Sequence, residues 1–137
     1  MKAREFSTGC QVDNMVVLEG VQGIGKSRAL RALGGKWYSS ASESVMYKDF
    51  YLILTGSLIM EIAELDSFKK AEVTRIKQVI SSPHDYYRVP YGRDAQVYPR
   101  MCVFVGTTNE REYLKDTTGA RRFWPIKCDM SFLAGIF

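Results

Sequence analysis

The sequence predicts an α/β fold with a largely parallel central sheet. Short apolar runs typical of buried strands alternate along the chain with segments of helical periodicity. A further pair of strand-like runs encloses a turn, which predicts an inserted β-hairpin. The 137 residues suffice for one domain, and 46% hydrophobic with 12% aromatic residues suffice for a packed core.

The first expected strand and helix surround a glycine-rich loop. Residues 15–19 form an apolar run of strand type, and residues 26–33 carry apolar side chains at helical spacing before Gly34 and Gly35 stop the helix. The loop between them reads GVQGIGKS, which matches G-x-x-x-x-G-K-[ST], the pattern of a phosphate-binding loop. A glycine-rich turn without a ligand is the alternative, and the flanking strand and helix disfavour it.

The loop pattern predicts how a nucleoside triphosphate would be held. Glycines let successive backbone N–H groups turn toward phosphates, and the following helix points its positive N-terminus at the same charge. Lys26 is expected to reach the β- and γ-phosphates, and Ser27 to offer its hydroxyl to Mg²⁺. The expected nucleotide contacts are Gly20, Val21, Gln22, Gly23, Ile24, Gly25, Lys26 and Ser27.

The remaining elements follow in order. Residues 37–39 are expected to form a short strand, 45–54 a helix, and 57–62 a second buried strand. Asp66 or Ser67 is expected to cap a helix that ends near residue 80. The expected hairpin strands are 86–89 and 96–101, followed by a buried strand at 102–107 and an edge strand at 122–126, where Pro125 favours the edge.

Composition limits the class of protein. The net charge of +4 and the pI near 9.0 suit a polyanionic partner. The three cysteines are widely spaced, and His84 is the only histidine, which argues against a zinc site and a disulfide framework. No apolar run approaches the roughly 20 residues of a membrane helix, and residues 1–5 lack an apolar signal core. We therefore expect a cytoplasmic protein without a membrane partner.

Acidic residues follow the second buried strand. A phosphate loop needs an acidic partner for Mg²⁺ and a group that prepares the attacking water. Glu61 and Glu64 are the candidates, and spacing leaves their order open. The alternative is a solvated cluster at the end of a strand. Asp66 is interpreted as a helix cap in preference to a ligand.

Two later segments also end near the expected site. Residues 103–107 are apolar and lead into small polar residues, so Asn109 is expected at the carboxyl edge of the sheet, where it would orient water or sense the γ-phosphate. A turn-forming asparagine is the alternative. Arg121 and Arg122 offer guanidinium groups of the kind that stabilise phosphoryl charge across a subunit boundary, and ordinary surface charge is the alternative.

Five motifs in order carry a family resemblance. The succession GVQGIGKS, LIMEIAELD, YYRVPYGR, VFVGTTN and TGARRFWPI resembles the virulence-associated E family of phage and mobile-element proteins, which is related to superfamily 3 helicases and primase-helicases of the AAA+ class. The similarity runs from about Ala3 to Lys127. It implies an AAA+-type P-loop NTPase sandwich that binds ATP and Mg²⁺, assembles as a homo-oligomeric ring, expected to be a hexamer, and drives DNA replication.

The resemblance also implies roles for residues. The implied catalytic residues are Lys26, Glu61, Glu64, Asn109, Arg121 and Arg122. The implied metal ligands are Ser27 and Glu61. The hairpin is similar in position to one that faces nucleic acid in the ring's channel. Its Arg88, Tyr91 and Arg93 combine phosphate-binding charge with a stacking surface for single- or double-stranded DNA, and a solvated basic loop is the alternative.

Family members are usually longer, so we expect residues 1–137 to be a single ATPase core from a longer architecture. Two other functions stay open. One is a module that binds nucleotide and DNA and oligomerises without efficient turnover. The other is a small-molecule P-loop kinase, although no acceptor pocket is evident in the sequence.

Overall fold

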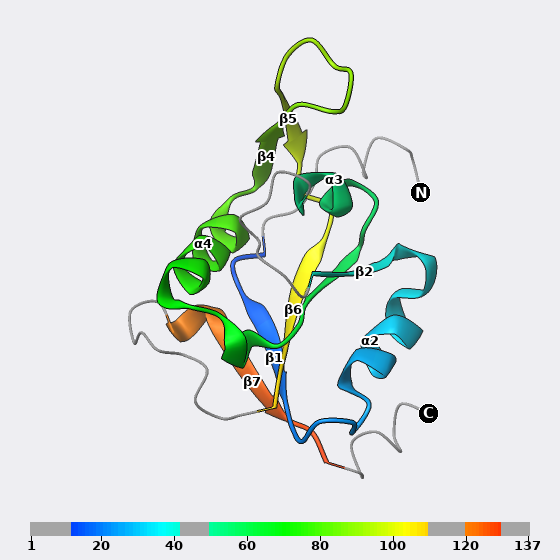
Figure 1. Ribbon diagram of the computed structural model, residues 1–137, viewed down its shortest axis with the longest axis vertical. Helices are drawn as coiled ribbons and strands as arrows, with labels where there is room; N and C mark the ends of the chain where they lie inside the picture. Colours follow the sequence, from blue (N-terminus) through cyan, green and yellow to red (C-terminus); the bar gives the residue numbers. More distant parts are fainter. Residues whose placement is uncertain (1–11, 42–49, 110–119, 130–137) are drawn as a thin grey trace.

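The computed structural model describes residues 12–41, 50–109 and 120–129 (Figure 1). Its strands are β1 (Met15–Glu19), β2 (Tyr38–Ala41), β3 (Ile59–Ile62), β4 (His84–Tyr87), β5 (Gln96–Pro99), β6 (Val103–Thr108) and β7 (Phe123–Lys127). Its helices are α2 (Lys26–Gly34), α3 (Phe50–Thr55) and α4 (Lys70–Ser81), with 3₁₀ turns η1 (Gly35–Trp37), η2 (Leu65–Ser67) and η3 (Ala120–Arg122).

Five strands form a parallel sheet in the order β2-β3-β6-β1-β7, and β4 pairs with β5 as an antiparallel hairpin. This confirms the predicted α/β fold with a parallel sheet and an inserted hairpin. From β1 the chain crosses to the far strand β2, whereas from β6 it crosses the other way to β7. The adjacent strands β1 and β6 therefore form a topological switch point, where ligands bind at the carboxyl ends of such sheets.

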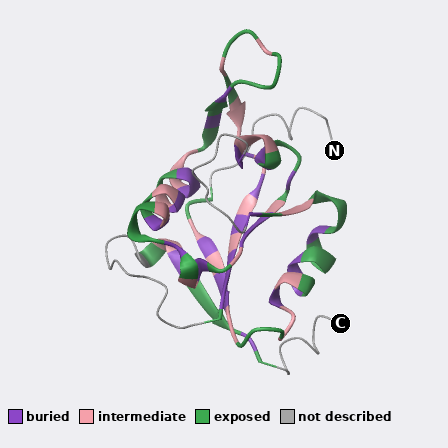
Figure 2. Ribbon diagram, in the orientation of Figure 1, coloured by how far each residue is buried: buried purple, intermediate pink, exposed green. Residues whose placement is uncertain are grey.

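Alternating side chains divide the core between the two faces of the sheet. Met15, Val17, Met60 and Phe104 belong to the larger cluster, which includes buried residues of α3 and α4. The opposite face packs a smaller cluster around Leu30 of α2. Figures 1 and 2 show α2 and α4 on opposite sides of the strands, whose buried positions concentrate between them.

The helix after β3 begins later than predicted. Neither Asp66 nor Ser67 caps it, because residues 65–67 form the separate turn η2 and Phe68 is extended. The N-cap of α4 is Lys69, whose backbone N–H donates to the Glu72 carboxylate at 2.8 Å. The capping prediction for Asp66 was therefore wrong, because the 3₁₀ turn intervenes between the strand and the helix.

Other predicted boundaries shift by a few residues. Trp37 closes η1, so β2 starts one residue later than the expected strand. The described part of the helix expected at 45–54 is α3, and residues 45–49 lie outside the described residues. Strand β7 lies at the sheet edge, as Pro125 predicts. Among the residues the structure describes, no helix is both long and apolar enough to cross a bilayer.

The hairpin projects from the amino-terminal end of the sheet (Figure 1). Arg100, between β5 and β6, anchors its stem from a buried position. The Arg100 guanidinium donates to both carboxylate oxygens of Asp85 in β4, at 3.0 and 2.5 Å, and to the Val79 carbonyl of α4 at 2.8 Å. The stem is thereby fixed to the last turn of α4.

Candidate nucleotide-binding site

The glycine-rich loop leaves the carboxyl end of β1 in a conformation that few other residues can adopt. Gly23 and Gly25 have φ angles of 82° and 97°, in the left-handed region where a Cβ atom is unfavourable. A Cβ atom on Gly20 would lie 2.8 Å from the Cys128 carbonyl oxygen. The Gly20 N–H donates to the Thr108 carbonyl at 3.2 Å, which ties the start of the loop to β6.

Lys26 is the first residue of α2, and its side chain turns back toward the loop. The ammonium donates to the carbonyl oxygens of Gly20 at 2.6 Å and Val21 at 3.0 Å, and to Asn109 Oδ1 at 3.1 Å. Burial lowers the pKa of Lys26, against the opposing influence of Cys128 and nearby carboxylates. The structure therefore brings Lys26 and Asn109 together at the switch point between β1 and β6.

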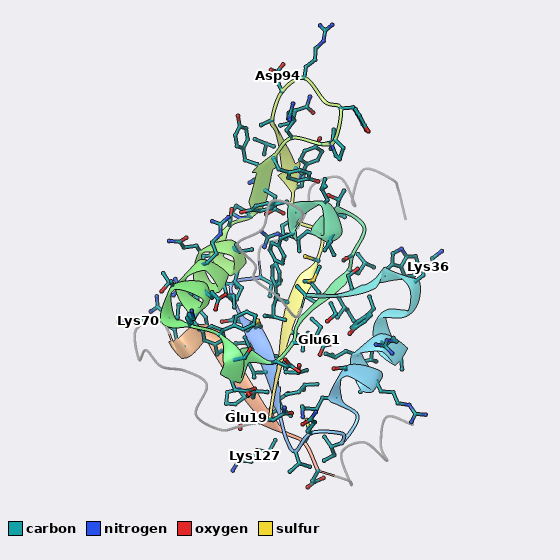
Figure 3. The ribbon with its side chains drawn as sticks, in the orientation of Figure 1. Glu19, Lys36, Glu61, Lys70, Asp94 and Lys127 are labelled. Atoms are coloured by element: carbon teal, nitrogen blue, oxygen red, sulfur yellow. The ribbon has the colours of Figure 1, made fainter. Side chains whose placement is uncertain are left out.

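Glu61 lies on β3 with its side chain fully buried between the sheet and α2 (Figure 3). Its Oε1 accepts hydrogen bonds from Ser27 at 2.6 Å and Thr107 at 2.8 Å, and its Oε2 accepts one from the Tyr38 hydroxyl. Burial raises the pKa of Tyr38, and so does this bond to Glu61. Three hydroxyl groups donate hydrogen bonds to the buried carboxylate and stabilise its charge.

The oxygen atoms of Glu61 and Ser27 are of the kind that binds a hard cation. Within the described ranges, no group of three or more His, Cys, Asp or Glu side chains gathers to enclose a metal. Ser27 and Glu61 offer one hydroxyl and one carboxylate side by side. Mg²⁺ favours this kind of set, because it is held by one or two protein oxygens and keeps waters and phosphates as its other ligands. The predicted metal pair therefore fits the ion by its chemistry.

Glu64 occupies a different environment from Glu61. It has left-handed backbone angles, φ 55° and ψ 50°, immediately before η2, and its side chain is exposed. It lines a cavity of about 260 Å³ whose other walls are Gln22, Gly23, Gly25, Lys26, Ser27, Arg28, Ala63, Thr107, Thr108 and Asn109. The two glutamates thus differ in environment: Glu61 is buried and bonded to Ser27, whereas Glu64 is exposed at the cavity wall.

Asp66 is a site residue that sequence reasoning did not identify. Its Oδ1 accepts hydrogen bonds from the Thr108 hydroxyl at 2.8 Å and from the Asn109 backbone N–H at 3.3 Å. Asp66 therefore fixes the backbone of the residue whose side chain contacts Lys26. The sequence carried only an indirect signal for this role. Asp66 comes soon after the buried strand β3, and the adjacent strand β6 also ends in polar residues.

The two arginines lie far from the loop of their own chain. They precede β7, whose first residue Phe123 pairs with Met15 and whose last residue Lys127 pairs with Glu19 at the loop. Five strand residues separate Arg122 from that end, a span of roughly 16 Å at about 3.3 Å per residue. The Arg122 Nε donates to the Ser81 hydroxyl of α4 at 2.9 Å, while Arg121 is exposed.

The three candidate nucleic-acid residues gather at the hairpin tip. Arg88, Tyr91 and Arg93 are all exposed, and Tyr91 has a positive φ of 65°. The Arg88 guanidinium donates to the Gly92 carbonyl at 3.3 Å within the turn. Figure 3 shows the tip, marked by Asp94, at the opposite end of the molecule from Glu19, which precedes the glycine-rich loop. Within one chain, the hairpin tip and the glycine-rich loop therefore lie at opposite ends of the sheet.

Known structures share this fold. The apo A form of the NrS-1 C-terminal region (CTR) superimposes with a TM-score of 0.62 at 19% identity, covering 88% of this chain and 30% of that one. The apo A form of NrS-1 CTR residues 305–718 gives 0.59 at 20% identity, covering 87% and 29%. The chain thus spans about 30% of the length of the NrS-1 region. No curated protein sequence matches the chain.

A family model describes the sequence over nearly its whole length. The model of the virulence-associated protein E-like domain matches residues 1–134. The match includes the loop, both glutamates, the hairpin and the arginine pair whose positions the structure now gives. The chain therefore belongs to the virulence-associated protein E-like domain family.

Proposed function

We propose that this chain is the ATP-binding and hydrolysing core of an AAA+-type, superfamily 3-like motor that acts on DNA in phage or mobile-element replication. The observation that carries the proposal is that two residues at the end of the loop contact polar side chains of two different strand ends. Lys26 contacts Asn109 after β6, and Ser27 contacts Glu61 on β3, at the carboxyl edge of a parallel sheet. A glycine-rich turn with only a structural role does not require this convergence.

In the proposed site each residue has a distinct task. Backbone N–H groups of the loop and the α2 N-terminus bind phosphate oxygens, and Lys26 exchanges its carbonyl partners for the β- and γ-phosphates. Ser27 and Glu61 would hold Mg²⁺, which would supply positive charge to the phosphates. The buried position of Glu61 beside Ser27 and the exposed position of Glu64 favour Glu64 as the group that prepares water, with Asn109 orienting it.

A finger from the neighbouring subunit completes the proposed site. Arg121 and Arg122 lie at the opposite end of the sheet from their own loop, so they suit a role in a second subunit of a homo-oligomeric ring. Arg121 is the better candidate of the two, because Arg122 is already bonded to Ser81. By family resemblance the ring is a hexamer, and the hairpin tips face DNA in its channel.

The test is steady-state ATP hydrolysis over a protein concentration series, with and without single-stranded DNA. The wild type is expected to show turnover that rises with protein concentration and DNA, and Lys26→Ala to abolish it. Arg121→Ala is expected to be inactive alone. Mixing Arg121→Ala with Lys26→Ala subunits should restore some activity, because a mixed interface can unite an intact loop with an intact finger.

Each outcome separates the candidate functions. Turnover that depends on a small acceptor and ignores DNA would indicate the kinase. ATP binding with oligomerisation and no turnover at any concentration would indicate a noncatalytic module. Equal binding and hydrolysis by wild type and Lys26→Ala would contradict a nucleotide role for the loop altogether.

A further inference from the structure

Tyr38, the first residue of β2, reaches the buried carboxylate of the proposed site. Strands β2 and β3 pair in parallel with Ser40 opposite Glu61, so Tyr38 lies two residues earlier on the same face. Its hydroxyl donates to Glu61 Oε2. Neither the loop pattern nor the spacing of the acidic residues singles out this tyrosine, because its position depends on the register between two strands.

The surroundings of Tyr38 hold its ring in place. A Cβ atom on Gly34, at the end of α2, would lie only 2.8 Å from Tyr38 Cβ, so glycine permits the close approach of helix and strand. The Arg31 guanidinium lies 5.5 Å from the ring centroid on the helix side. The ring also packs against the smaller core cluster around Leu30. The hydroxyl is therefore presented to Glu61 by a ring fixed on several sides.

The division of hydrogen bonds between the two carboxylate oxygens has a consequence. Because Tyr38 bonds to Oε2, the carboxylate is oriented with Oε1 toward Ser27 and Thr107. Ser27 is the loop residue whose hydroxyl suits Mg²⁺. Groups that orient a metal-binding carboxylate without touching the metal commonly change metal affinity by 10–100-fold when removed.

We propose that Tyr38 is a positioning residue that orients Glu61, and that it thereby sets the affinity of the nucleotide site for Mg²⁺. The inference rests on the proposed nucleotide function of this site. It assigns Tyr38 no contact with nucleotide and no part in the loop. Loss of the hydroxyl should therefore weaken binding only when metal is present.

The experiment measures the Kd of a fluorescent ATP analogue in excess Mg²⁺ and again in EDTA. The ratio of the two values reports the contribution of the metal, without any need for turnover. For Tyr38→Phe we expect this ratio to fall about tenfold, with the EDTA value unchanged. Tyr87→Phe is the matched control, because it removes a hydroxyl that bonds to Thr55 away from the site, and its ratio should equal that of the wild type.

A double-mutant cycle tests whether Tyr38 acts through Glu61. In a Glu61→Gln background, adding Tyr38→Phe should change the ratio little, because the group that Tyr38 orients has already been altered. Should Tyr38→Phe fail to fold, Gly34→Ala provides a second variant. Its added methyl group would press on Tyr38 and displace the ring, although the ring keeps its hydroxyl. The ratio should therefore fall in this variant as well.

The outcomes distinguish the proposed role of Tyr38 from the proposed nucleotide-binding function. A wild type that does not bind the analogue overturns both. A wild type with metal-enhanced binding and a Tyr38→Phe variant with the same enhancement overturns only the role of Tyr38. Equal weakening in Mg²⁺ and in EDTA also overturns it, because that pattern indicates general damage to the site.

Discussion

Removing one member of the buried pair of Arg100 and Asp85 should cost much stability, and the loss can be measured without any ligand. The side chains are 3% and 6% exposed and are joined by two hydrogen bonds. Arg100 also satisfies the Val79 carbonyl, and its guanidinium lies 5.0 Å from the Phe104 ring centroid. Replacing Arg100 with methionine keeps much of the apolar volume, but leaves a buried carboxylate and a carbonyl without this donor.

Removing one member of a buried ion pair costs about 3–5 kcal/mol, because the remaining charge stays out of water. A domain has only about 5–15 kcal/mol of stability in total, so Arg100→Met should be close to unfolding at 37 °C. The double replacement Arg100→Met with Asp85→Leu removes both charges and should recover most of the loss. The contrast between single and double variants tests the charge argument separately from packing.

Urea denaturation followed by circular dichroism gives the free energy of unfolding for each variant. Arg93→Met at the exposed hairpin tip is the matched control, and it should change stability by less than about 0.5 kcal/mol. A loss below about 1 kcal/mol for Arg100→Met would refute the reasoning, as would a double variant that is no more stable than the single one.

Two further predictions concern the loop and the hairpin. Gly20→Ala should destabilise the domain by about 1–3 kcal/mol, because its Cβ would meet the Cys128 carbonyl, whereas Gly56→Ala meets nothing within 4 Å and should be nearly neutral or slightly stabilising in thermal melts. Equal melting temperatures would contradict the close approach. Arg93→Ala should weaken DNA binding in fluorescence anisotropy, with a shallower salt dependence and unchanged ATP affinity. Identical affinities at every salt concentration would exclude a DNA contact at this residue.

Local patterns predicted the first strand, the glycine-rich loop and the first helix well. The apolar run of β1, the glycines of the loop and the periodicity of α2 are all close in sequence, and the structure has them with nearly the predicted bounds. The hairpin was also predictable, since its strands enclose a turn containing Pro90 and Gly92. Asn109 followed from a buried strand that ends in polar residues at the carboxyl edge.

The missed contacts depend on pairing between distant segments. Tyr38 contacts Glu61 because of the register between β2 and β3. Thr107 contacts Glu61 because of the register between β3 and β6. Asp66 was misassigned because a capping residue and a residue that fixes a neighbouring strand end have the same composition signal. Sequence spacing also left Glu61 and Glu64 equivalent, whereas the structure buries one and exposes the other.

The last turn of α4 connects two parts of the molecule that the sequence keeps apart. The Val79 carbonyl accepts from Arg100 at the hairpin stem, and the Ser81 hydroxyl accepts from Arg122 beside the exposed Arg121. Because both bonds are made within one turn of helix, the hairpin stem and the arginine segment rest on the same support. That support belongs to the larger core cluster through Val79 and includes no residue of the glycine-rich loop.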